Sequence, residues 1–450
     1  MAEENNNKLG YESGEYEIPL TERKILTQSS EPTISSLCDR VDKGKVEVKA
    51  DFQRKYVWEN KPLIKSRLLE SVILNIPIPA IYTAEDEKTG KEIVIDGQQR
   101  LLTFHGFINN KFKLKGLSVL KELNGYFYKD LSNEKDETIK NLKDKLGDLQ
   151  DLIGDRSIRV IKILKESHPD IKFEIFERLN RGSVKLNDQE LRNCIYRGNF
   201  NDLMKELVKN KDFQRLQGLK NSHSRMLDVE RVLRFFAFCD RSERNYKAPL
   251  KKFLNDYMKS KQDIEENEIE TKKELFKKSV ELCQTVFGNV SYRRVFAGGE
   301  DNPNGYIDDS LNQGIFDIQM YDFMEYSKRD IVPKAQVIKD AFIDLVTSNE
   351  KFIETIEIGT YGTNQVKKRT EMWINKLREI VNLPSTDKRL FTYEDKKRLF
   401  DADNTCAICK NKITYIEDAH VDHIERYSEG GETKIKNGRL THRYCNLQRG

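Results

Sequence analysis

Four residues near the end of the chain have the types and the spacing of zinc ligands. Cys406 and Cys409 form a C-x-x-C pair, and His442 and Cys445 form an H-x-x-C pair farther on. Two such pairs, brought together by an intervening hairpin, can supply a tetrahedral Cys3His site for Zn²⁺. A segment this short buries little apolar surface, so metal binding would supply much of its folding free energy. We therefore predict a structural zinc site.

A second set of residues in the same segment has the types that hydrolytic chemistry requires. Asp422 and His423 are adjacent in the sequence HVDHI. Asn437 follows in IKNGRL, and Asn446 comes directly after the last cysteine. Carboxylate and carboxamide oxygens are hard ligands that suit Mg²⁺ or Mn²⁺ rather than zinc. An imidazole can take a proton from water near neutral pH.

Together these residues resemble the HNH endonuclease signature, D-H … N … C-N, on a ββα-metal fold. The resemblance covers almost all of the segment 406–450. It implies that His423 is the general base and that Asp422 and Asn446 hold one Mg²⁺ ion. It also implies that Asn437 orients the loop of the catalytic histidine. The expected activity is hydrolysis of DNA phosphodiesters.

The other two histidines of the segment have supporting roles in this interpretation. His442 stands where many HNH proteins carry cysteine, and since both side chains bind zinc the zinc prediction is unaffected. His420 lies at strand spacing from Asp422 and therefore on the same face. We expect His420 to support the site rather than to act in it.

The elements that precede this segment begin with a predicted alternation of helices and strands. From Thr33, ISSLCDRVDKGKVEV indicates a helix and then a strand. Residues Pro62 to Leu74 have helical spacing, with proline in the first turn. Two strands follow, at 80–82 and 92–95, joined by a turn at Thr89-Gly90.

The sequence Asp96-Gly97-Gln98-Gln99-Arg100 comes directly after the second of these strands and opens a predicted helix. A strand, a glycine turn and a helix N-terminus form a ready anion site, because free N–H groups and the helix dipole point at the ligand. Arg100 adds a forked donor for phosphate. The alternative is an ordinary turn in which Asp96 caps the helix.

Four blocks in this region resemble the ParB-like N-terminal domain of GmrSD-type restriction proteins, a family that includes SspE-like defence proteins. They are FQRKYVW, NIPIP, IDGQQRLLT and FERLNRGSVKLNDQELRNCIY. The resemblance implies binding or hydrolysis of a nucleotide (NTP), sensing of modified DNA, or both. It places this function on Asp96, Gly97, Gln98, Gln99 and Arg100, with Gln53 and Arg54 as companions. From the last block, Asn180 and Arg181 are candidates for phosphate contact, and a salt bridge that holds the fold is the alternative for Arg181.

The next part of the chain is predicted to be a helical bundle, since apolar residues recur there at three and four positions. A DNA-tracking face is the alternative for its basic surface, which includes Lys247, Lys251, Tyr246 and Tyr257. The stretch 298–314 is loop-like, and the sequence indicates no role for it. A second basic run follows Glu432, and phosphate contact and ordinary solvated surface are its two interpretations: Lys434, Lys436, Arg439, Arg443 and Arg449.

Composition favours a cytoplasmic protein. No apolar run approaches transmembrane length, and the first residues do not form a signal peptide. The cysteines outside the zinc pairs are scattered singly, which indicates reduced thiols. The net charge is only +4 although 34% of the residues are charged. A basic surface for nucleic acid would therefore have to be a local patch.

We expect an α+β protein with four parts. Residues 1–32 form a flexible lead-in, 33–200 a ParB-like α/β domain, 201–384 a helical domain, and 385–450 a zinc-bound ββα-metal domain. Their combination resembles modification-dependent, type IV-like restriction and phage defence, with modified or phage DNA as the partner. In one alternative the DGQQR domain only senses DNA and uses no nucleotide. In another the protein is a DNA-binding regulator without turnover. A single ββα-metal site cuts one strand at a time, so a double-strand break requires a homodimer or two events.

Overall fold

The computed structural model describes most of the chain. The described ranges are 25–48, 58–86, 89–179, 186–241, 245–382, 391–426 and 431–448. Contacts between residues divide the chain into two compact units, with a boundary in the sequence between Arg197 and Gly198. We call them the N-terminal unit and the C-terminal unit. Among the helices of the described ranges, none is both long and apolar enough to cross a membrane.

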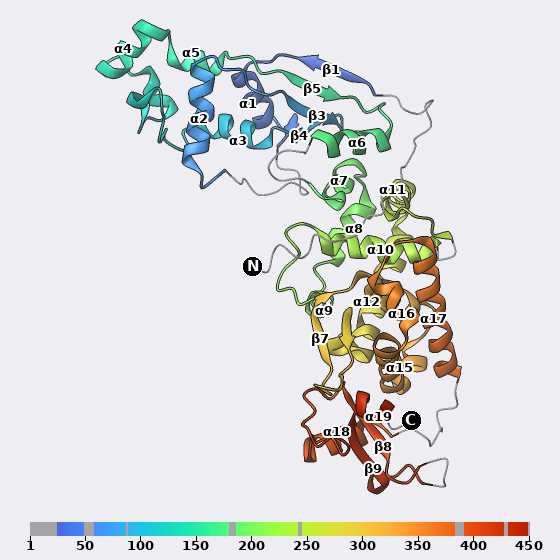
Figure 1. Ribbon diagram of the computed structural model, residues 1–450. Coiled ribbons are helices and arrows are strands. Elements are labelled where there is room, and N and C mark those ends of the chain that lie inside the picture. The colour runs from blue at the N-terminus through green and yellow to red at the C-terminus, as the bar shows by residue number, and fades with distance from the viewer. Residues whose placement is uncertain are drawn as a thin grey trace. The chain divides into compact units, whose positions relative to one another are not determined.

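A mixed five-stranded sheet forms the centre of the N-terminal unit (Figure 1). Its order is β1-β5-β3-β4-β2, with β3 antiparallel to β4 and parallel to β5, while β2 runs parallel to β4 and β1 antiparallel to β5. The strands are β1 (Thr27–Ser30), β2 (Val46–Glu47), β3 (Ile81–Glu85), β4 (Glu92–Asp96) and β5 (Val160–Ile163).

Seven helices of the described residues complete this unit. They are α1 (Ile34–Asp42), α2 (Pro62–Ile73), α3 (Gln98–Ile108), α4 (Glu137–Leu146), α5 (Leu149–Gly154), α6 (Pro169–Leu179) and α7 (Asp188–Ile195). The apolar faces of α1 to α5 share one core with the sheet, in which Leu69, Val94 and Phe104 are fully buried. Asn187 and Glu190 form a reciprocal capping box at the start of the last of these helices.

The expected flexible lead-in includes a strand that the sequence did not reveal. Thr27–Ser30 pairs antiparallel with β5, and all four residues are exposed. Leu26 and Ser167 extend the pairing with a further hydrogen bond of 3.0 Å. The sequence TQSS has no apolar alternation, because this edge strand is held through its backbone rather than by burial. The predicted flexible lead-in, residues 1–32, therefore includes residues that belong to the folded sheet.

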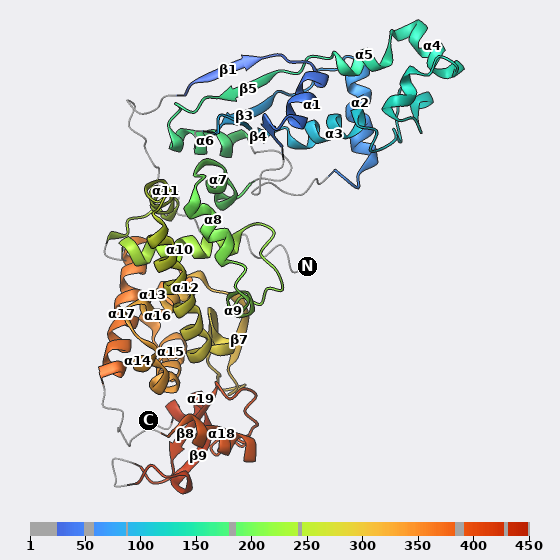
Figure 2. The same cartoon turned by 180° about the vertical axis from the view of Figure 1, so that it is seen from behind.

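Helices make up most of the first part of the C-terminal unit, which agrees with the bundle prediction. Viewed from behind, α12, α13 and α15 lie together (Figure 2). The helices are α8 (Asn199–Leu207), α9 (Lys211–Leu216), α10 (Leu227–Arg241), α11 (Leu250–Ser260), α12 (Glu266–Val286), α13 (Gln313–Tyr321), α14 (Lys328–Ile331), α15 (Ala335–Ser348), α16 (Glu350–Glu357) and α17 (Thr363–Asn382). Tyr246 and Tyr257 are fully buried, so they cannot stack on DNA bases.

The region 298–314 is a hairpin with a long tip rather than a plain loop. Strand β6 (Arg293–Phe296) pairs antiparallel with β7 (Tyr306–Leu311), and the rings of Phe296 and Tyr306 stack with their centroids 4.5 Å apart. We call residues 297–305 the hairpin tip. The strand was not apparent from the sequence because YIDDSL carries acidic residues on a largely exposed ribbon.

The last part of the C-terminal unit is a small ββα element, which we call the zinc module (residues 391–448). Helix α18 (Tyr393–Ala402) leads into it, and the antiparallel strands β8 (Ala419–His423) and β9 (Gly438–His442) are followed by α19 (Arg443–Gln448). A capping box between Thr392 and Asp395 opens α18. A mixed sheet with helices, a helical middle and a ββα region with a Cys3His cluster confirm the α+β class.

Candidate functional site

The β8–β9 hairpin brings the two predicted sets of residues together. Its register pairs Ala419 with His442 at one end and His423 with Gly438 at the other. One end of the hairpin therefore carries a predicted zinc ligand, and the other carries the expected base. Helix α19 packs against both strands and carries Cys445.

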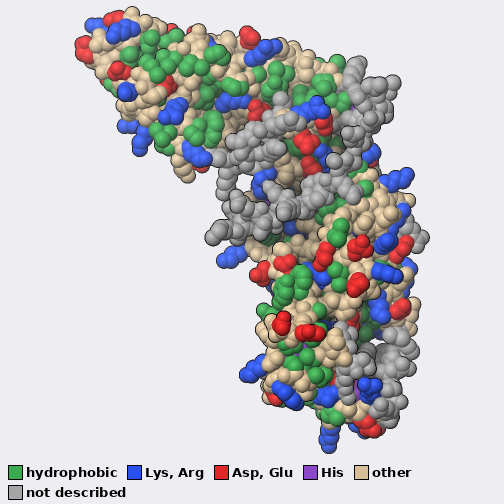
Figure 3. All heavy atoms as spheres, viewed as in Figure 1, with side chains coloured by type: hydrophobic (Ala, Val, Ile, Leu, Met, Phe, Trp, Pro, Cys, Tyr) green, Lys and Arg blue, Asp and Glu red, His purple; other side chains and the backbone are tan. Residues whose placement is uncertain are grey.

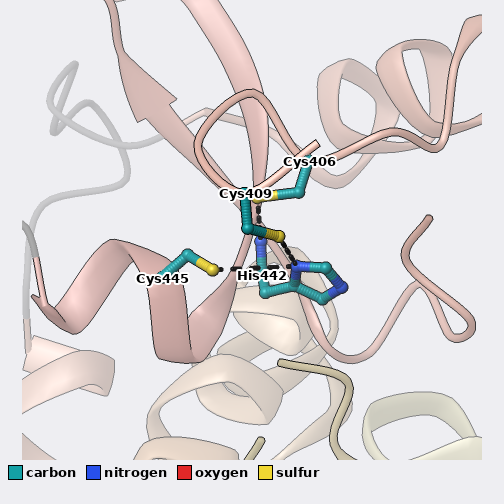
Figure 4. Close-up of side chains that lie close together, drawn as sticks. All are labelled: Cys406, Cys409, His442 and Cys445. Carbon is teal, nitrogen blue, oxygen red and sulfur yellow. Dashed lines mark hydrogen bonds between the residues drawn. The ribbon is translucent and has the colours of Figure 1, made fainter. Parts of the chain in front are cut away.

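The four predicted zinc residues form one cluster (Figure 4). Their ligand atoms all lie within 4.8 Å of one another. Sγ of Cys409 and Sγ of Cys445 lie 3.4 and 3.8 Å from Nδ1 of His442. Zn–S and Zn–N bonds of about 2.3 and 2.0 Å give tetrahedral edges of roughly 3.5–3.8 Å. The cluster therefore has the chemistry and the dimensions of a zinc site.

Local structure prepares the cluster for a cation. Burial opposes ionisation of the Cys406 thiol, but backbone N–H groups of Cys409, His442 and Ile408 point at its sulfur, and its pKa is lowered. Nε2 of His442 faces Oδ1 of Asn304 at 3.1 Å and the carbonyl oxygen of Lys412 at 3.3 Å. Since both partners are acceptors, Nε2 carries the proton and Nδ1 presents its lone pair to the cluster.

Asp422 is bound to an arginine on the neighbouring strand. Nε and Nη2 of Arg439 donate to the same carboxylate oxygen, Oδ2, at 3.0 and 2.8 Å. The two residues are direct cross-strand partners in the β8–β9 register. This pairing keeps a positive charge beside the carboxylate and fixes its direction.

The imidazole of His423 is held from two sides. Its Nε2 lies 3.0 Å from Oγ1 of Thr433, and the ring of Phe391 packs on it with centroids 4.6 Å apart. A Cβ at Gly438, its strand partner, would come within 2.9 Å of the Phe391 ring. The glycine thus leaves room for the aromatic ring that orients the histidine.

Asn437 fastens the loop between the two strands. Its Oδ1 accepts from the backbone N–H of Glu425 at 2.9 Å, and its Nδ2 donates to the carbonyl oxygens of Glu425 and Glu432 at 3.1 and 2.9 Å. These bonds involve the residue two positions after His423 and the residue directly before Thr433. Asn437 therefore ties together the two ends of the loop that follows His423.

Asn446 and His420 are the remaining predicted residues of the zinc module. Asn446 lies half-buried on α19, one residue after Cys445. Because Cys445 belongs to the zinc cluster, the cluster also restrains the location of Asn446. His420 lies on β8, and the charges of Arg443 and Lys396 act on its ring. Burial is the main cause of the lowered pKa of His420, and the charge of Arg443 adds to it. The ring is therefore neutral near pH 7, and the described residues offer its Nδ1 no hydrogen-bond partner.

The basic run after Glu432 does not form a single DNA-facing surface. Arg443 is 5% exposed and binds Asp340 of α15 at 2.5 Å, so it serves the interior of the C-terminal unit. Arg439 binds Asp422, and Lys436 is exposed. On the face in Figure 3, Lys and Arg side chains alternate with Asp and Glu. The phosphate-contact prediction is therefore wrong for Arg443, because a buried guanidinium cannot reach a duplex.

The DGQQR loop of the N-terminal unit is built around Gly97. This residue has φ 96° and precedes the first turn of α3, and a Cβ there would come within 2.9 Å of Ile81. Arg100 donates to Oδ2 of Asp96 at 2.7 Å and to the carbonyl oxygens of Pro79 and Ala80. Asp96 therefore does not cap the helix, as the turn alternative required, but pairs with Arg100 one turn on.

The two glutamines of the loop also bind the backbone. Nε2 of Gln98 donates to the carbonyl oxygen of Val48 at 2.8 Å, and Oε1 of Gln99 accepts from the N–H of Trp58 at 3.1 Å. Among the described residues, no side-chain cap is present at the N-cap of α3, Gly97. The remaining predicted companions, Gln53, Arg54, Asn180 and Arg181, lie outside the described residues.

Sequence reasoning missed several residues that contact the candidate site. The cross-strand position of Arg439 follows from the strand register, which could have been inferred from the hairpin. Thr433, Phe391 and Asn304 are brought in by loops and by a segment more than a hundred residues away, and no local pattern marks them.

Comparison with known families gives two matches. Residues 34–197 match the family described as GmrSD restriction endonuclease, N-terminal domain. Residues 406–450 match the family described as HNH endonuclease. A search of curated proteins finds no match. The first match includes the DGQQR loop, and the second includes all four zinc residues, so both resemblances inferred from the sequence are confirmed.

Proposed function

Because the chain joins the N-terminal domain of GmrSD restriction endonucleases to an HNH endonuclease domain, we propose that it is a cytoplasmic, modification-dependent DNA endonuclease of a restriction or phage-defence system. The observation that carries the proposal is the placement of His423. It follows Asp422 on β8, its ring is held by Thr433 and Phe391, and the zinc cluster lies at the other end of the same hairpin.

The proposed chemistry is hydrolysis of a phosphodiester bond. His423 takes a proton from the attacking water, and Thr433 and Phe391 hold the imidazole in the plane that this transfer requires. Asn437 keeps the loop between β8 and β9 in place. Arg439 binds the Asp422 carboxylate and fixes its direction.

Asp422 and Asn446 are the residues that would hold a divalent ion, Mg²⁺ or Mn²⁺, since both offer oxygen atoms and neither is part of the zinc cluster. Such an ion would neutralise the negative charge of the scissile phosphate and of the departing oxygen. In the structure the Asp422 carboxylate is paired with Arg439, so a cation bound there would share Asp422 with the guanidinium.

The zinc cluster has a structural role in this proposal. Three thiols and an imidazole at tetrahedral spacing close the coordination sphere, so no position is left for substrate. One zinc per chain is the expected content. The cluster ties the C-x-x-C turn to the start of α19, and thereby fixes Asn446.

The N-terminal unit is proposed to control when and where cleavage occurs. The uncapped first turn of α3 supports binding of a nucleotide phosphate or a DNA phosphate, because its N–H groups carry the positive end of the helix dipole. Asp96, Gln98, Gln99 and Arg100 are the residues proposed for this function.

One observation favours a second candidate for this unit, a sensor of modified DNA that uses no nucleotide. Arg100 already donates to Asp96, Pro79 and Ala80. A guanidinium with these internal bonds must break them before it can hold a triphosphate. Under this candidate, DNA binding alone regulates cleavage.

The test is cleavage of phage DNA carrying modified bases, compared with an unmodified plasmid, in Mg²⁺ with and without each of GTP, ATP, UTP and CTP. Faster cleavage of the modified DNA supports modification dependence, and a further increase with one nucleotide supports nucleotide control. Cleavage unaffected by any of the four supports the sensor alone. No cleavage of either DNA under any condition contradicts the enzyme proposal and favours a regulator. Linear product from a single-hit time course indicates a homodimer.

A further inference from the structure

The hairpin tip of the helical region reaches the zinc module. In both ribbon views the segment between β6 and β7 runs to this module (Figures 1 and 2). Oδ1 of Asn304 accepts from the backbone N–H and the hydroxyl group of Thr414, at 2.9 and 3.1 Å. The next residue, Gly305, donates its N–H to Oδ2 of Asp418 at 3.0 Å. The same Asn304 oxygen lies 3.1 Å from Nε2 of the zinc ligand His442.

The close approach of the tip depends on a glycine. A Cβ at Gly305 would lie 2.5 Å from the carbonyl oxygen of Phe296 and 2.9 Å from Oδ1 of Asp418. Both contacts are shorter than real Cβ atoms tolerate. A larger residue at this position would push the tip away from the module, so the sequence N-G places an amide oxygen where it meets the imidazole.

A second set of contacts holds the module from α15. Arg443, the residue after His442, donates to Asp340 and to Asp344, and Lys396 binds Asp340 at 3.3 Å. Nε of Arg443 also donates to the carbonyl oxygen of Glu417 at 2.9 Å. The helical region therefore contacts the zinc module through the hairpin tip and through α15. His442 contacts the first, and the next residue, Arg443, contacts the second.

The direction of the hydrogen bond to His442 is fixed by its neighbours. The backbone N–H of Thr414 can only donate, so the atom of Asn304 that faces it is the carbonyl oxygen. That oxygen and the carbonyl oxygen of Lys412 are both acceptors for Nε2 of His442. Nε2 must therefore be protonated, and Nδ1 is the nitrogen turned to the three sulfur atoms.

We propose that Asn304 is a positioning residue of the metal centre, supplied by the helical region to the zinc module. Its amide oxygen holds the Nε2 proton of His442 and thereby selects the tautomer that offers Nδ1 to zinc. Zinc retention consequently depends on docking of the hairpin tip. This inference rests on the zinc site of the proposed function, but not on cleavage, and it gives the region 298–314 a role.

The experiment measures zinc affinity of the full-length protein by competition with a chromogenic chelator. Partners that orient a ligating histidine are typically worth 10- to 100-fold in metal affinity. We expect Asn304→Ala to weaken zinc binding about 10-fold or more. Asn304→Asp, which keeps an acceptor, should stay within about threefold of wild type. Thr414→Val, which removes only the hydroxyl contact to Asn304, should also stay within about threefold.

A double-mutant cycle separates positioning from docking. A thiolate ligand has no second nitrogen and needs no partner, so in the His442→Cys background Asn304→Ala should change zinc affinity by less than about threefold. An equal loss in both backgrounds, or an equal loss in Thr414→Val, would show that Asn304 only docks the tip and would overturn the proposal. Unchanged affinity in Asn304→Ala would also overturn it. If the wild type fails to cut DNA but the zinc affinities of the variants are as expected, only the proposed nuclease function is contradicted.

Discussion

Arg443 offers a sharp test of the structure, because its sequence context indicated DNA contact and its environment indicates a buried ion pair. We consider Arg443→Met, which keeps the apolar stem and removes the guanidinium. The lost hydrogen bonds are those to Asp340, Asp344 and the carbonyl oxygen of Glu417. The matched control is Lys436→Met, which removes an exposed cation from the same basic run.

The magnitude follows from the exposure of the partners. Removing one member of a fully buried pair costs about 3–5 kcal/mol. Here the side chains of Asp340 and Asp344 are 32% and 61% exposed, so water offsets part of the loss. Burial opposes ionisation of Asp340, but Lys396 and Arg443 hold its pKa below the usual range, and Lys396 remains in the variant. We therefore expect a loss of roughly 1.5–3 kcal/mol, in the range of charge-assisted hydrogen bonds.

Thermal unfolding and DNA binding together give the assay. The expected loss corresponds to a fall in Tm of roughly 3–12 °C for a unit of this size. Lys436→Met should stay within about 0.5 kcal/mol of wild type. The reasoning is refuted if Arg443→Met melts with the wild type and instead binds DNA more weakly than Lys436→Met.

Three further predictions follow from individual contacts. Thr433→Val removes the hydroxyl group that holds His423 and should slow cleavage about tenfold or more with zinc content unchanged; an unaltered rate would exclude a role for Thr433. Burial raises the pKa of Asp418 to about 6, so its ionisation destabilises the fold as pH rises from about 4 to above 6. Asp418→Asn keeps an acceptor for Gly305, and should raise the free energy of unfolding by roughly 1–3 kcal/mol at pH 7.5 and by little near pH 4; equal gains at both pH values would contradict this. If the internal bonds of Arg100 are its main role, as in the sensor candidate, Arg100→Ala should lower the stability of the N-terminal unit by roughly 1.5–3 kcal/mol. An unchanged melting curve with a 10- to 100-fold loss of nucleotide affinity by titration calorimetry would instead support nucleotide binding by Arg100.

The metal centre was predictable because ligand chemistry restricts both residue type and spacing. Two pairs with two-residue spacers, at Cys406 and at His442, were sufficient to place the cluster. The strand holding Asp422 and His423 and the capping boxes that open α7 and α18 also depend on local sequence alone. These features are set by hydrogen bonds and spacings within a few residues.

The remaining parts depend on contacts that no local pattern encodes. The strand Thr27–Ser30 is polar and exposed, so its pairing with β5 leaves no apolar signature. Arg443 looks like any surface cation until α15 brings Asp340 beside it. Asn304 meets His442 across 138 positions of the chain. Long-range docking of this kind decides which polar side chains are buried, and the sequence shows it only after the fold is known.

The central claim is that His423 is the base of a DNA-cutting site, and one comparison tests it directly. Purified wild type and His423→Ala are assayed on susceptible DNA in Mg²⁺, beside their zinc contents and melting curves. Removal of a general base costs about 10² to 10⁴ in rate. We expect at least a hundredfold loss of cleavage in a variant with one zinc per chain and wild-type stability. Cleavage at the wild-type rate by that folded, zinc-loaded variant would contradict it.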